Sequence, residues 1–239
     1  MRTYHRARPA RGARCRSRSA TTRAPAEPAT ASHTGAWAAP YTLTGKWATQ
    51  SVMGGMYRVN NNIWGADTPQ TVSGDTDSTY YEVTYSGHSQ GGVASYPFVQ
   101  RGPHWGGSNT ANSPFPAQVS SITSAPFVWN VDTSVARADT SVTQSWNVAY
   151  ESWFSLAGGT APDRAELMIW IDYENMGSGG SLVDVVSIGG YDWDVYHATG
   201  WGSWNHYIAY RIQAPIDSVA LDFRDFMDDS LARGWLDEN

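Results

Sequence analysis

A single glutamate interrupts the apolar segment Ala165–Ile171, which reads AELMIWI. Side chains of a β-strand alternate between two faces, so Glu166, Met168 and Trp170 should share one face and the aliphatic residues between them the other. The aliphatic face is typical of a protein core. The first face offers an acid, a thioether and an indole in a row, which suits a sugar-binding cleft. The alternative is a strand whose glutamate simply points to solvent.

A second carboxylate lies in another strand-like segment. In the alternating run from Ser141 to Glu151, the side chains of Asn147 and Glu151 fall on one face, with Trp153 continuing it. If this strand neighbours Glu166 in an antiparallel sheet, two carboxylates share one cleft. Close carboxylates raise the pKa of one member and share a proton, which tunes a nucleophile. The pair is a cue for glycosyl transfer, although a solvated pair fits the pattern as well.

The aromatic content points to the same class of ligand. The chain has 239 residues, with twelve tryptophans, thirteen tyrosines and only 16% charged residues, and Lys46 is its one lysine. Indole and phenol rings stack on the apolar faces of pyranose rings. In the segment Asn60–Gly65, amides and an indole stand together at the end of a candidate strand, before a polar loop. Aromatic core packing is the alternative explanation for these residues.

The elements that must position these residues read as short strands separated by glycine pairs. Candidate strands are 57–60, 79–85, 93–96, 141–151 and 181–188, and pairs such as Gly54-Gly55 and Gly189-Gly190 mark turns between them. The spacing predicts one helix, between Val219 and Arg233, that ends before Gly234. We expect one all-β domain over residues 37–239: a two-sheet antiparallel β-sandwich, jelly-roll or concanavalin-like, with one C-terminal helix.

The first 36 residues have a different composition and are expected to be a disordered Arg/Ala/Pro-rich leader or tail. Residues 1–31 hold eight arginines and one acid, whereas the remainder holds 8 basic and 21 acidic residues. An acidic domain excludes electrostatic binding of nucleic acid. The leader resembles a secretory signal without its apolar middle, so we expect a secreted domain behind an atypical leader. Cys15 is the only cysteine, which leaves the domain without a disulfide, and no run is long enough for a membrane span.

Three segments together resemble glycoside hydrolase family 12, the β-jelly-roll endoglucanases: 61–65 (NNIWG), 147–151 (NVAYE) and 166–170 (ELMIW). They stand in the family's order and at about its spacing. Gly92–Pro97 and His104-Trp105-Gly106 are similar to its bacterial branch, although the cysteines that often bracket the second motif are missing. Asp217–Asp237 is similar to the family's single helix and the turn after it.

The resemblance implies retaining hydrolysis of β-1,4-glucan. Glu166 matches the nucleophile, and Glu151 matches an acid, commonly Asp, that supports it. The other implied ligands of the sugar are Asn62, Trp64, Asn147, Met168 and Trp170. The family needs no cofactor, and the scattered histidines give no metal spacing. We expect a β-glucan polysaccharide as partner, neither membrane nor nucleic acid, and a monomer.

The resemblance also exposes a departure. The family's acid/base Glu lies on a strand after the helix, and this sequence reaches Asn239 without it. The domain is therefore expected to lack its last strands and to be nearly inactive on unactivated glucan. Three readings stay open: an endo-β-1,4-glucanase, with xyloglucan as an alternative substrate; a glucan-binding pseudoenzyme; and a lectin-like sandwich in which Glu166 is incidental.

Overall fold

A computed structural model describes residues 36–64, 69–85, 93–138, 145–156, 158 and 162–238. Most of the expected leader, with Cys15, and Gly65 of the Asn-rich segment lie outside these ranges. No helix in the described part is long and apolar enough to cross a membrane. Its strands and α-helices are β1 (Pro40–Leu43), β2 (Thr49–Val52), β3 (Tyr57–Asn60), β4 (Gln70–Asp75), β5 (Tyr81–Tyr85), β6 (Phe98–Gln100), β7 (Pro126–Asn130), α1 (Ser134–Ala138), β8 (Trp146–Phe154), β9 (Ala165–Glu174), β10 (Ser181–Ile188), β11 (Tyr191–Trp201), β12 (Trp204–Ile212), β13 (Ser218–Asp222) and α2 (Phe223–Ala232).

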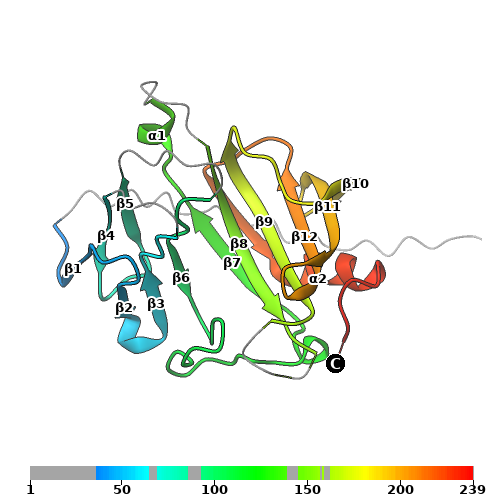
Figure 1. Ribbon diagram of the computed structural model, residues 1–239, viewed down its shortest axis with the longest axis horizontal. Coiled ribbons are helices and arrows are strands. Elements are labelled where there is room, and N and C mark those ends of the chain that lie inside the picture. The colour runs from blue at the N-terminus through cyan, green and yellow to red at the C-terminus, as the bar shows by residue number, and fades with distance from the viewer. Residues whose placement is uncertain are drawn as a thin grey trace, which may run out of the picture.

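The largest sheet has the order β10-β11-β12-β9-β8 and forms the right-hand side of Figure 1. Its neighbours are antiparallel except β12 and β9, which run parallel. The alternation expected for β9 is present: Leu167 and Ile169 are fully buried in the main core. Glu166, Met168 and Trp170 therefore lie on the opposite face, which we call the Glu166 face.

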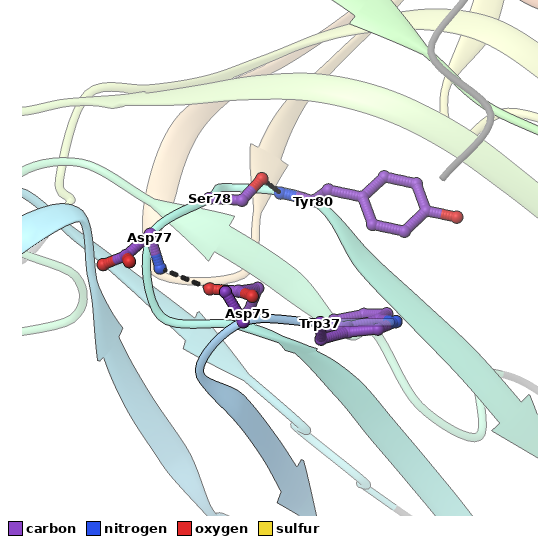
Figure 2. A pocket seen from close by; sticks show the side chains of 6 residues that line it. Trp37, Asp75, Asp77, Ser78 and Tyr80 are labelled. Carbon is purple, nitrogen blue, oxygen red and sulfur yellow. Dashed lines mark hydrogen bonds between the residues drawn. The ribbon is translucent and has the colours of Figure 1, made fainter. Parts of the chain in front are cut away.

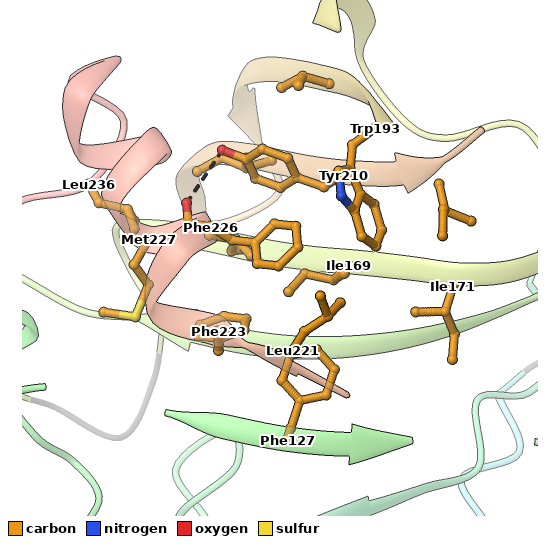
Figure 3. Close-up of a cluster of buried hydrophobic side chains, with 14 of the residues drawn as sticks. Phe127, Ile169, Ile171, Trp193, Tyr210, Leu221, Phe223, Phe226, Met227 and Leu236 are labelled. Atoms are coloured by element: carbon orange, nitrogen blue, oxygen red, sulfur yellow. Dashed lines mark hydrogen bonds between the residues drawn. The ribbon is translucent and has the colours of Figure 1, made fainter. Parts of the chain in front are cut away.

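The main core fills the space between the other face of this sheet, the β7–β13 pair and α2 (Figure 3). The ring of Phe226 on α2 meets that of Trp193 on β11 edge to face, with centroids 5.0 Å apart. The Tyr210 hydroxyl is hydrogen-bonded inside this core: it donates to Asp229 Oδ2 at 2.7 Å and lies 2.8 Å from Ser230 Oγ. The core fixes β9 and β12 from behind, so their outward side chains are held in place.

The expected helix begins later than its spacing predicted. Val219 and Leu221 belong to β13, which pairs with β7, and α2 starts only at Phe223. The two residues are buried two positions apart, which is the period of a strand. Because the apolar residues of the helix follow directly, the two patterns together resembled one longer helix. Asp222 ends the strand as the helix N-cap, because its carboxylate accepts a 2.9 Å hydrogen bond from the backbone N–H of Arg224. The five-residue helix α1 was not expected.

The remaining strands form two smaller sheets with a core of their own. Sheets β1-β4-β5 and β2-β3-β6 enclose a cluster built on Val52, Val59 and Val72, each at most 1% exposed. The expected segment 93–96 forms only an isolated bridge, from Ser95 to Ile63. Among the described residues, β5, β6, β7 and β8 each have one strand neighbour, so each leaves one edge unpaired within these sheets.

Candidate active site

Glu166 is held near the start of β9 between two aromatic neighbours. In the sheet register it lies opposite Trp153 on β8 and Tyr207 on β12. Its side chain is enclosed, with the residue only 8% exposed. Burial, and then the nearby charge of Glu151, raise the pKa of the Glu166 carboxyl to about 8. A carboxyl desolvated and crowded in this way is typical of a functional site.

Glu151 is the second carboxyl of the Glu166 face. It lies opposite Met168 on the adjacent antiparallel strand, which makes it a diagonal neighbour of Glu166 on the same face. Burial raises the pKa of Glu151 to about 7, and a hydrogen bond from Trp153 opposes that rise. From the sequence, the two carboxylates were expected to share a cleft if their strands were neighbours, and the register shows that β8 and β9 are antiparallel neighbours. Two such groups hold a proton between them near neutral pH.

Met168 and Trp170 continue the Glu166 face but lie beneath its surface. They are 5% and 2% exposed and pack with Tyr207 and Ala209 in a small apolar cluster. Both the Trp170 indole N–H and the Tyr207 hydroxyl approach the Met168 sulfur at 3.5 Å. In this structure the two side chains support the floor of the site, and direct contact of either with a sugar stays a prediction.

Asn62 and Trp64 form an exposed aromatic platform beside Tyr96. The Trp64 indole N–H donates to Asn62 Oδ1 at 3.0 Å, and the Asn62 amide donates to the Tyr96 carbonyl at 2.7 Å. The rings of Trp64 and Tyr96 are stacked with centroids 6.2 Å apart. Trp64 is 50% exposed, so its indole is available at the surface rather than packed in a core.

The platform is connected to the carboxyl pair through Tyr96. The amide of Asn147 lies 3.3 Å from the Tyr96 hydroxyl. Burial, followed by the charge of Glu151 and with a smaller contribution from Glu166, raises the pKa of Tyr96 well above its usual range. The predicted residues Asn62, Trp64, Asn147, Glu151 and Glu166 therefore form one continuous site.

Two tyrosines of this site were not singled out as functional from the sequence. Tyr96 and Tyr207 both lie close enough to Glu166 for its charge to raise their pKa values, after the larger effect of burial. Tyr207 lies in β12, which was not among the strands expected from the sequence. Tyr96 belongs to the Gly92–Pro97 segment that resembles the bacterial branch, but its place beside Asn147 depends on a contact between residues about fifty positions apart.

A group of tryptophans borders the Glu166 end of β9. The rings of Trp105, Trp153 and Trp204 meet edge to face with centroids 4.6–5.4 Å apart. Trp105, from the His-Trp-Gly motif, is 47% exposed. The site thus has aromatic surface at Trp64 and at Trp105. Among the described residues, no three His, Cys, Asp or Glu side chains gather as a metal site.

A buried carboxyl pair on a β-sheet face with exposed indoles beside it fits the two-carboxylate chemistry of glycoside hydrolases. The chain belongs to glycosyl hydrolase family 12, whose sequence model matches residues 55–239. The predicted family and the predicted jelly-roll fold are both confirmed.

Three similar proteins illustrate the match. Endoglucanase S of Pectobacterium parmentieri is 30% identical over 186 residues, which are 72% of this chain and 66% of that protein. Xyloglucan-specific endo-beta-1,4-glucanase A of Emericella nidulans is 28% identical over 196 residues, 77% of this chain and 72% of that protein. The structure of endoglucanase Cel12A from Rhodothermus marinus superposes with a TM-score of 0.74 at 36% identity, covering 83% of this chain and 85% of that one.

The raised pKa of Glu166 makes stability depend on pH. A buried carboxyl whose folded-state pKa is raised stabilises the fold fully below its unfolded pKa, about 4.3. That contribution is lost as pH rises through about 8. Between pH 5 and 8.5 we expect the Tm of the wild type to fall further than that of Glu166→Gln, by on the order of 5 °C.

Calorimetry at several pH values measures this difference. Glu82→Gln, which removes an exposed carboxylate on β5, is the matched control and should follow the wild type. Parallel curves for the wild type and Glu166→Gln would show that Glu166 is not desolvated in the folded protein.

Proposed function

We propose that this protein is a retaining endo-β-1,4-glucanase. The observation that carries the proposal is the close placement of Glu166 and Glu151 on one sheet face, with the half-exposed Trp64 beside them. The relatives support it by name: one is an endoglucanase and another a xyloglucan-specific endo-β-1,4-glucanase. The substrate would be a β-glucan polysaccharide. Because such polymers occur outside the cell, we propose that the protein is secreted, and we propose that it is a monomer.

Glu166 acts as the nucleophile in the proposed mechanism. Its carboxylate oxygen attacks the anomeric carbon, the glycosidic bond breaks, and the leaving oxygen takes a proton from a general acid. Water, deprotonated by the same group as a base, then displaces Glu166 and restores the original configuration. Glu151 supports the nucleophile: its carboxyl shares a proton with Glu166 in the free enzyme and controls how readily Glu166 ionises.

The unpaired edge of β8 is the place where one more strand would bring a general acid onto the Glu166 face. Among the described residues, β8 has only β9 as a strand neighbour, and β6 of the β2-β3-β6 sheet has only β3. Tyr96 and Asn147 already connect these two sheets through a hydrogen bond. A strand entering between β6 and β8 would bring one more side chain onto the Glu166 face. The second candidate, a glucan-binding pseudoenzyme, would leave this edge open.

The proposed activity is tested on soluble β-glucans. An endoglucanase lowers the viscosity of carboxymethyl-cellulose well before many reducing ends appear, and proton NMR of the first product from a short cello-oligosaccharide should show the β-anomer. Xyloglucan compared with carboxymethyl-cellulose separates the two substrate classes. Formation of the α-anomer first would exclude a retaining mechanism, and binding without any turnover would favour the pseudoenzyme.

Trp64 should provide much of the sugar-binding energy. Stacking of an indole on a pyranose ring buries apolar area, so Trp64→Ala should weaken cellotetraose binding by roughly 1–3 kcal/mol. Calorimetric titration measures the change. Trp64→Phe, which keeps a ring but loses the hydrogen bond to Asn62, should lose less. Equal affinity of the wild type and Trp64→Ala would mean that the sugar does not touch this platform.

A further inference from the structure

A pocket lies away from the Glu166 face, at the end of the β1-β4-β5 sheet. It encloses about 230 Å³ and is lined by Trp37, Ala38, Asp75, Asp77, Ser78 and Tyr80 (Figure 2). All of its lining comes from the segment before β1, from Asp75 at the end of β4 and from the turn between β4 and β5. None of these residues belongs to β8, β9 or β12, the strands that position the carboxyl pair, or to the Asn62–Trp64 platform.

Two aromatic rings form a wedge at this pocket. The rings of Trp37 and Tyr80 have centroids 5.9 Å apart and are inclined by 53°, so their faces diverge. Both side chains project to the same side of the turn in Figure 2. Both residues are half-buried, which keeps them fixed while part of each ring borders the pocket. Diverging aromatic faces on a fixed support provide apolar area for the C–H face of a sugar ring.

The polar lining is held rigid by the turn itself. The Asp75 carboxylate accepts hydrogen bonds from the backbone N–H groups of Ala39 at 3.0 Å and Asp77 at 2.9 Å. Ser78 Oγ accepts a third, from the N–H of Tyr80, at 2.9 Å. These bonds connect the segment before β1 to the turn, so the pocket is formed before any ligand arrives. The exposed carboxylate of Asp77 remains at the rim as an acceptor for hydroxyl groups.

The chemistry of the lining selects the kind of ligand. Among the described residues, the lining contains two aspartates and neither arginine nor lysine, so an anion is disfavoured. The volume is below the roughly 300 Å³ at which pockets for drug-sized molecules begin, and suits one sugar ring. Apolar ring faces combined with hydroxyl acceptors match a neutral pyranose.

We propose that this pocket is a second glucan-binding site, which holds one glucose unit of a polymer chain away from the catalytic carboxyls. The proposal rests on the proposed function, because it assumes that the polymer is a β-glucan. Two sites on one chain raise the effective concentration of polymer at the enzyme, whereas a short oligosaccharide that occupies only the Glu166 face gains nothing.

The test compares retention on a polymer with turnover of a short substrate. Native gels containing soluble β-glucan, together with depletion onto insoluble cellulose, measure polymer affinity, and an aryl cellobioside measures catalysis. Trp37→Ala should weaken polymer retention by about fivefold to tenfold while its turnover of the aryl cellobioside stays within twofold of the wild type. Asp77→Ala should weaken retention in the same direction, and because Asp77 is exposed this variant tests the site without disturbing the fold.

Controls make each outcome decisive. Trp47→Ala removes another exposed tryptophan, 61% exposed and outside this pocket, and should retain the polymer better than Trp37→Ala. If Trp64→Ala impairs both assays while Trp37→Ala and Asp77→Ala impair neither, the second site is refuted and the proposed function stands. If neither Trp64→Ala nor Trp37→Ala changes glucan binding, the proposed function itself fails. Competition by choline at the same pocket would assign it to cations instead.

Discussion

Glu166→Gln is expected to lower turnover of an activated aryl cellobioside by about a thousandfold or more. Such a substrate has a leaving group that needs no protonation, so its first step depends on attack by the nucleophile alone. The amide of glutamine is a poor nucleophile and cannot form the glycosyl ester, and removal of one member of a covalent catalytic unit typically costs at least this much. Because Gln keeps the size and shape of Glu, packing between Trp153 and Tyr207 should be preserved.

The measurement is a burst of released aryl alcohol, together with the intact mass of the protein. With a slowly turned-over aryl 2-fluoro cellobioside, the wild type should release the aryl alcohol and gain one fluorocellobiosyl group, a disaccharide, which peptide mapping should place on the peptide that contains Glu166. Glu151→Gln is the matched control: it removes the neighbouring charge but leaves the nucleophile, so labelling should persist. Its apparent pKa for labelling should fall, since the charge of Glu151 contributes to the raised pKa of Glu166. A label on Glu151 would reverse the two assignments.

The carboxyl pair was predictable from the sequence because it depends on local alternation. The period of two in β9 fixes the side on which Glu166 lies, and the same period in β8 does so for Glu151. The step that alternation alone leaves open is whether the two strands are neighbours, and the family resemblance supplied it. The register then determines that Glu151 faces Met168 rather than Glu166 directly.

Burial of Trp170 was not predictable from the same pattern. Alternation assigns Trp170 to the Glu166 face, but it says nothing of what covers that face. In the structure Trp170 is nearly enclosed by Met168 and its neighbours, whereas Trp64, in an irregular segment after β3, stays half exposed. The alternation of a strand predicts the direction of a side chain. How deeply that side chain is buried depends on contacts between segments that are distant in the sequence. The start of the helix was misplaced for a related reason. Leu221 at the end of β13 and Phe223 at the start of α2 are both buried, so burial does not mark where the strand ends and the helix begins.

A glutamate on a strand paired with the open edge of β8 would be placed to act as the acid/base. Strands are spaced about 4.8 Å apart, so this strand would lie roughly 10 Å from β9. Two glutamates reaching inward over the same face can close that separation to the roughly 5–5.5 Å of a retaining pair. The segment after α2 lies near the end of β8 and the start of β9: Asp237 forms a 2.7 Å ion pair with Arg164, whose backbone N–H bonds to the carbonyl of Phe154, the last residue of β8.

The prediction compares the 239-residue chain with a version extended by a strand–turn–strand segment that carries one glutamate. General acid–base catalysis contributes about 10²–10⁴-fold, so the extension should raise hydrolysis of carboxymethyl-cellulose by that factor. The burst from an activated aryl cellobioside should change much less. An extension with glutamine in place of that glutamate is the control: it should improve solubility by covering the β8 edge, without restoring activity.

The opposite result would identify the acid/base within the present chain. If the 239 residues alone hydrolyse carboxymethyl-cellulose efficiently, protonation of the leaving oxygen must come from a carboxyl already beside Glu166. Glu151 is then the candidate, because its charge acts on Glu166 and its pKa of about 7 suits proton donation near neutral pH. Glu151→Gln would in that case abolish hydrolysis of the polymer while sparing the aryl cellobioside burst. Under the proposed mechanism, Glu151→Gln instead shifts the pH dependence of polymer hydrolysis and of the aryl cellobioside burst alike. Assaying this one variant on the two substrates therefore decides which carboxyl delivers the proton.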